Sequence, residues 1–143
     1  MRLAFAAVLV LVSCGSTAPQ SEVSQSPPIE TASTTEPTAE QRFPDVVAAE
    51  ATQDAGGTWT FAVTLSSPYD TPDRYADSWR VKGPDGTVYG ERFLTHDHAN
   101  EQPFTRSQSG IEIPDNVDTV EIEGRDQVYG WGGTTLTLEL QRP

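Results

Sequence analysis

The sequence predicts one all-β domain, an antiparallel β-sandwich of about seven strands, like an immunoglobulin or fibronectin type III domain. Apolar and polar residues alternate with a period of two in several short segments, which is typical of half-buried strands. Turn-forming residues separate these segments at short intervals, and no segment shows a convincing helical repeat. Frequent short strands with this spacing favour a two-sheet sandwich. A small closed β-barrel is the alternative.

The clearest strand runs from Trp59 to Leu65, where every second residue is a large apolar one. Trp79 and Val81 face one side of another segment, while Ser78 and its polar neighbours face the other. Trp79 then fits the central buried tryptophan of such sandwiches. Further strands are expected over 46–52, 87–94, 111–113, 119–123 and 135–140, and Pro103 marks the start of one more.

Turn chemistry falls between the predicted strands. Gly83-Pro84-Asp85-Gly86 should close a hairpin, because proline presets φ and the second glycine supplies a positive φ. Segments 54–57 and 114–116 should form two more turns. Gly130-Trp131-Gly132-Gly133 is expected to be a turn before the last strand. The longer segment 67–77 has three aspartates and is predicted to be a solvated acidic loop.

Cys14 is the only cysteine, and it ends the tetrapeptide Leu11-Val12-Ser13-Cys14. Arg2 and a short apolar run precede it, which is the layout of a secretory signal peptide. The run is roughly half of the ~20 residues that a membrane-spanning helix needs. The tetrapeptide also resembles a bacterial lipobox, and the resemblance implies a lipid such as palmitate on Cys14. We therefore expect membrane attachment through this lipid.

Three regions are predicted along the chain. Residues 1–13 form a cleaved signal peptide, 14–42 the lipidated cysteine with a disordered tether, and 43–143 the β-sandwich domain. The tether is rich in serine, threonine, proline and glutamate, so it cannot bury enough apolar surface to fold. The expected location is the cell envelope: the outer membrane or periplasm of a Gram-negative cell, and the cell surface otherwise.

The chain is strongly acidic, with a formal net charge of −12. Nucleic-acid binding is not expected, because phosphate contacts are made by lysine and arginine. An acidic surface suits solubility, cation binding or a basic partner. We expect a monomer, with an envelope protein as the candidate partner.

The two histidines, His96 and His98, are candidate metal ligands together with Glu101. On an extended strand, residues i and i+2 face the same side, so both imidazoles could reach one ion. Imidazole and carboxylate ligands suit copper or zinc, although a closed structural zinc site uses four ligands. The alternative is that the histidines cap a loop by hydrogen-bonding to backbone groups and to Asp97, with no cofactor.

Arg106, Tyr129 and Trp131 are candidate ligand- or partner-binding residues. Arg106 could bind an anionic group through its planar guanidinium, or form an ion pair with Glu101. Tyrosine and tryptophan are common binding anchors, but in a sandwich they also cover the end of the core.

Several segments resemble an uncharacterised family of small bacterial envelope proteins. They are Tyr75 to Val81 with Gly83 to Val88, the stretch His96-x-His98-x-x-Glu101-Gln102-Pro103-Phe104-Thr105-Arg106-Ser107, and Gly130 to Gly133. The resemblance implies an envelope location and no established activity.

No nucleophile elbow or phosphate-binding loop occurs in the sequence. The chain is therefore predicted to be a lipid-anchored, non-catalytic binding or interaction module. A metal-binding envelope module using His96 and His98, and an envelope hydrolase, are the alternatives.

Overall fold

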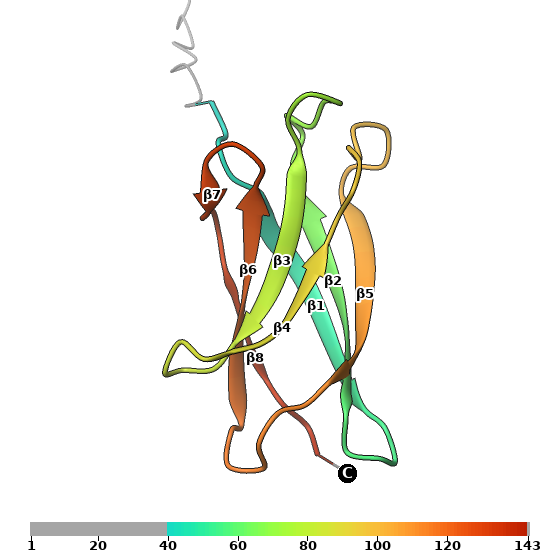
Figure 1. Ribbon diagram of the computed structural model, residues 1–143, viewed down its shortest axis with the longest axis vertical. Coiled ribbons are helices and arrows are strands. Elements are labelled where there is room, and N and C mark those ends of the chain that lie inside the picture. The colour runs from blue at the N-terminus through green and yellow to red at the C-terminus, as the bar shows by residue number, and fades with distance from the viewer. Residues whose placement is uncertain (1–39, 143) are drawn as a thin grey trace, which may run out of the picture. The chain divides into compact units, whose positions relative to one another are not determined.

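The computed structural model describes residues 40–142, which form two antiparallel sheets packed face to face (Figure 1). One sheet has the order β1-β2-β5, and the other has the order β4-β3-β6-β7, with β8 also paired to β6. The strands are β1 (Asp45–Gln53), β2 (Trp59–Ser66), β3 (Ala76–Lys82), β4 (Val88–Phe93), β5 (Phe104–Ile111), β6 (Thr119–Asp126), β7 (Gly130–Trp131) and β8 (Leu136–Glu139). The predicted sandwich is confirmed, and the barrel alternative is wrong.

Cys14, the predicted signal peptide and most of the predicted tether lie outside the described residues. Between residues 40 and 142 no helix is long and apolar enough to cross a membrane. Gln41, two residues before the predicted start of the domain, contacts the sandwich. Its side-chain amide donates hydrogen bonds to the carbonyls of Phe43 and Ser66 at 2.9 and 3.1 Å.

The core lies between the sheets and follows the alternation that the sequence shows. In β2 every second residue, from Trp59 to Leu65, is completely buried. Trp79 and Val81 from β3 and Val120 and Ile122 from β6 are completely buried as well. Ser78 is also buried, because Glu91 and the carbonyl of Arg92 accept hydrogen bonds from its hydroxyl on the outer face.

The predicted hairpin joins β3 and β4. The N–H of Gly83 donates to the carbonyl of Thr87 at 2.8 Å, and the N–H of Gly86 donates to that of Gly83 at 3.0 Å. Gly86 has a φ of 84°, which is the left-handed conformation that glycine adopts without strain.

The segment from Gly130 to Gly133 is not simply the predicted turn. Gly130 and Trp131 form β7, which pairs with the end of β6, while β8 pairs with the beginning of β6. Between these two strands, Thr134 contacts the other sheet: its carbonyl accepts from the N–H of Val46 at 2.9 Å, and its own N–H donates to Asp45 at 2.8 Å. The last edge of one sheet is thereby tied to β1 of the other.

The glycines of this segment make room for Phe43 and Pro44. A Cβ on Gly132 would lie 2.8 Å from the Phe43 ring, and a Cβ on Gly133 would lie 2.2 Å from the Pro44 carbonyl oxygen. Gly124 on β6 also makes room for Pro44, since a Cβ added at Gly124 would lie 2.6 Å from Cγ of Pro44. These close approaches explain why glycine occupies the three positions that contact Phe43 and Pro44.

We predict that Gly133→Ala destabilises the domain by at least about 2 kcal/mol more than Gly57→Ala, because overpacking adds to backbone strain. Gly57 is a matched control: both glycines have a φ near 90°, but a Cβ on Gly57 meets nothing within 4 Å. Strain alone should cost about 1–2 kcal/mol at either position. Urea unfolding of the two variants measures the difference, and equal losses would contradict the close approach to Pro44.

Candidate functional site

Three loops meet at one end of the sandwich, and the segment that leads into β1 lies at the same end (Figure 1). They are residues 67–75 between β2 and β3, residues 94–103 between β4 and β5, and residues 127–129 between β6 and β7. We call these three segments the loop end. Loops carried on a rigid scaffold are where binding residues concentrate.

Asp70 links two of these loops through its buried carboxylate. Its Oδ1 accepts a hydrogen bond from the N–H of Ala76 at 3.0 Å, and its Oδ2 accepts one from the N–H of His98 at 3.1 Å. Only 4% of Asp70 is exposed, so the expectation of a solvated acidic loop is wrong at this position. The carboxylate is buried because it satisfies backbone donors from two different segments.

Gln102 provides a second link between the same loops. Its Oε1 accepts from the N–H of Ser67 at 2.7 Å, and its Nε2 donates to the hydroxyl of Ser67 and to the carbonyl of His98. The sequence predicted no role for Gln102 and placed Asp70 in a solvated loop, since nothing local in the sequence shows that distant backbone groups need these side chains. Together they hold the backbone of His98 from both sides.

His98 is almost completely buried, with 1% of its surface exposed. Its ring stacks on Phe104 with centroids 3.8 Å apart and lies 4.8 Å from the ring of His96. Neither ring nitrogen has a hydrogen-bond partner among the described residues. The loop-capping alternative is therefore wrong for the His98 ring, and Asp97 instead accepts a hydrogen bond from the N–H of Ala99.

Burial lowers the pKa of His98 below its ordinary value, because desolvation disfavours the charged imidazolium. The positive charge of Arg106 and the neighbouring His96 lower this pKa further, while the carboxylates of Glu101 and Asp70 oppose the shift. At neutral pH the His98 ring is therefore uncharged, with one nitrogen lone pair available.

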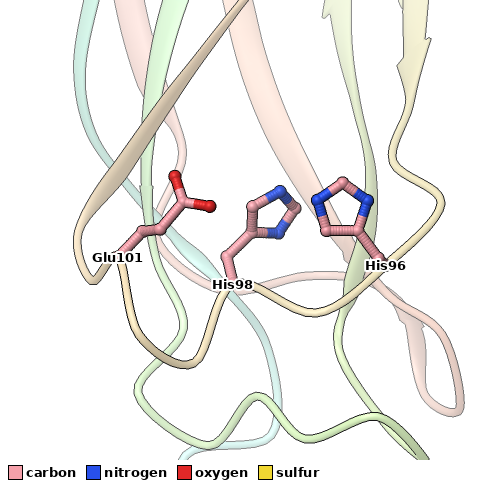
Figure 2. A group of neighbouring side chains, drawn as sticks. All are labelled: His96, His98 and Glu101. Carbon is pink, nitrogen blue, oxygen red and sulfur yellow. The ribbon is translucent and has the colours of Figure 1, made fainter.

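His96 and Glu101 lie on either side of His98, in the same loop (Figure 2). These residues lie in a loop and not on an extended strand, yet one potential ligand atom from each of the three residues lies within 4.8 Å of the others. Ligand atoms on one tetrahedral zinc ion are about 3.3 Å apart. Small rotations of the exposed side chains of His96 and Glu101 would close the difference.

Arg106 forms an ion pair with Glu101, which is one of the two roles that the sequence suggested for it. Its Nη2 donates to both carboxylate oxygens at 3.0 and 3.1 Å, and this hydrogen bonding lowers the pKa of Glu101. Half of the Glu101 side chain is exposed. An exposed pair of this kind contributes only about 0–1 kcal/mol, so Glu101 can be redirected at small cost.

The structure places Tyr129 and Trp131 against other arginines. The guanidinium of Arg74 lies between the rings of Tyr69 and Tyr129, at 4.3 and 4.7 Å from their centroids, and that of Arg80 lies 3.9 Å from Trp131. Arg106 has its own aromatic contact, with Phe104 at 5.4 Å. The three predicted binding residues therefore contact different parts of the chain.

Arg74 also holds the start of the domain. Its Nε donates to the completely buried Asp126 at 3.1 Å, and its Nη2 donates to the carbonyl of Arg42 at 3.0 Å. Asp126 accepts two further hydrogen bonds, from the N–H groups of Val128 and Tyr129. One ion pair thus connects the residues before β1 with two segments of the loop end.

A curated protein of Halomicrobium mukohataei, described as "Putative lipoprotein", is 40% identical to this chain over 90 residues. The match covers 62% of this chain and 44% of the relative, so the chain spans less than half of that relative's length. No family model matches the chain. No solved structure matches it either.

Asp70→Ala should lower the free energy of unfolding by at least about 2 kcal/mol, because two buried N–H donors lose their acceptor at about 1–3 kcal/mol each. Asp54→Ala is a matched control: Asp54 accepts from the N–H groups of Gly56 and Thr58, but it is exposed, so water can replace it. Denaturant unfolding compares the two. If Asp70→Ala lowered the free energy of unfolding as little as Asp54→Ala does, the carboxylate of Asp70 would not hold the two loops together.

Arg74→Met should destabilise the domain by about 3–5 kcal/mol, since it leaves the carboxylate of Asp126 buried without its cation. Arg106→Met removes a half-exposed pair and should cost about 0–1 kcal/mol. Thermal or chemical unfolding of both variants measures the contrast. Similar stability of the two variants would be inconsistent with a buried Arg74–Asp126 pair.

Proposed function

We propose that this chain is a lipid-anchored protein of the cell envelope, whose β-sandwich domain is a non-catalytic binding module. The observation that carries the proposal is Cys14, the only cysteine, at the end of a short apolar run and directly after Leu-Val-Ser. The relative from Halomicrobium mukohataei, which is described as "Putative lipoprotein", supports it.

The similarity to that relative extends into the sandwich. Only 40 residues of this chain lie outside the range 40–142, so more than half of a 90-residue match must fall within it. The support therefore does not come from a signal-like segment alone, because the match includes part of the sandwich domain.

A binding role for the domain is supported by the construction of the loop end. Asp70 and Gln102 fix the backbone of the loop that carries His96, His98 and Glu101. Polar side chains held on a rigid scaffold can bind a ligand without first ordering a loop, which lowers the entropic cost of binding.

Replacing Cys14 tests the anchor. In a host that processes lipoproteins, the wild-type chain should enter the detergent phase of membrane extracts and incorporate radiolabelled palmitate. Cys14→Ser should do neither, because no other thiol can carry the lipid.

Ser16→Ala, two residues further along, is the matched control and should behave as the wild type. A Cys14→Ser chain that stays in the detergent phase, or a wild-type chain that never enters it, would exclude lipid anchoring through this residue.

A further inference from the structure

We propose that the loop end binds a divalent transition-metal cation of the Zn²⁺, Cu²⁺ or Ni²⁺ class, with His96, His98 and Glu101 as its protein ligands. The inference names the ligand of the proposed binding module and rests on that module. It does not depend on the lipid anchor, which concerns a different part of the chain.

The first argument is the unpartnered ring of His98. Buried polar groups in proteins almost always have a hydrogen-bond partner, because an unpaired one costs free energy. His98 has 1% of its surface exposed, and neither of its ring nitrogens has a partner among residues 40–142. A cation bound at one nitrogen would supply the missing interaction.

The second argument is the convergence of two more ligands on the same place. His96 and Glu101 flank His98, and a ring nitrogen of His96 faces His98 (Figure 2). The three potential ligand atoms lie within 4.8 Å of one another. His96 and Glu101 are exposed, so both side chains can move toward an ion that His98 holds in place.

The third argument is the carboxylate of Asp70 behind His98. Histidines that ligate metals commonly donate their other ring N–H to a carboxylate, which fixes the tautomer. Nδ1 of His98 lies 3.9 Å from Oδ2 of Asp70, which two backbone N–H groups hold in position. This separation is longer than a hydrogen bond. We therefore expect a small shift of the ring on metal binding to bring Nδ1–H to Asp70, which would make Asp70 a positioning residue and leave Nε2 for the cation.

The donor set determines the class of cation. Two imidazoles and one carboxylate suit Zn²⁺, Cu²⁺ and Ni²⁺, whereas Ca²⁺ and Mg²⁺ prefer sites built from oxygen alone. Three protein ligands leave a coordination position for water or for an exchangeable ligand, unlike a closed structural zinc site. The site is therefore suited to reversible binding, with Cu²⁺ held more tightly than Zn²⁺.

Replacing Arg106 should change the metal affinity in the opposite direction to replacing a ligand. It carries a positive charge beside the site and occupies both oxygens of Glu101. Removing this charge should strengthen cation binding, because it relieves repulsion and frees the carboxylate. Arg106→Met is therefore expected to bind Zn²⁺ several-fold more tightly than the parent chain.

The experiment is a calorimetric titration of the full chain with Zn²⁺, followed by Cu²⁺ and Ca²⁺. The chain carries Cys14→Ser throughout, which removes the only thiol as a competing ligand. We expect one Zn²⁺ per chain, with His96→Ala weakening binding by about 10-fold or more, which corresponds to losing one ligand interaction. Glu101→Gln should weaken it as well.

Two features keep this test decisive. His96 is exposed, so its replacement leaves the folded core intact, and circular dichroism checks that it does. Glu112→Gln, which removes an exposed carboxylate at the opposite end of the sandwich, should leave the Zn²⁺ affinity unchanged.

Several results would overturn the proposal. They are the absence of Zn²⁺ and Cu²⁺ binding tighter than about 100 µM, identical titrations of the parent and His96→Ala chains, and equal affinity for Ca²⁺. None of these results affects the test of the lipid anchor, which measures whether the chain enters the detergent phase. Failure of the metal site can therefore be distinguished from failure of the anchor.

Discussion

The geometry of the loop end depends on one buried carboxylate. Asp70 accepts the N–H of Ala76, where β3 begins, and the N–H of His98, which lies in the loop before β5. Two segments that are far apart in the sequence are thereby held at a fixed separation, and Gln102 adds a second connection between them. A loop fixed in this way acts as part of the scaffold, which is what a preorganised binding site requires.

The strands were predictable because burial in a sandwich imposes a period of two, and β2 shows that period without interruption. Residues whose role depends on distant partners were not predictable. Gly130 and Trp131 read locally as a turn, but the end of β6 pairs with them to form β7. Asp70 read as solvated, because its backbone partners come from other segments of the chain.

The spacing of His96 and His98 indicated that their rings could lie together, although a loop rather than a strand brings them there. The burial of His98 could not be inferred from spacing, since it results from stacking on Phe104 across the start of β5. The chain enters the sandwich at this same end, where Arg74 binds the carbonyl of Arg42. Attachment to the N-terminal segment and the candidate ligands therefore share one end of the domain.

The central claim is that the buried ring of His98 binds a cation, and nitrogen-15 NMR of the histidine rings tests it most directly. The chain has only two histidines, so each ring gives its own set of signals. On addition of one equivalent of Zn²⁺, the account predicts that one ring nitrogen of His96 and one of His98 shift together to values typical of a metal-bound imidazole. Ring spectra that do not change with Zn²⁺ would contradict it.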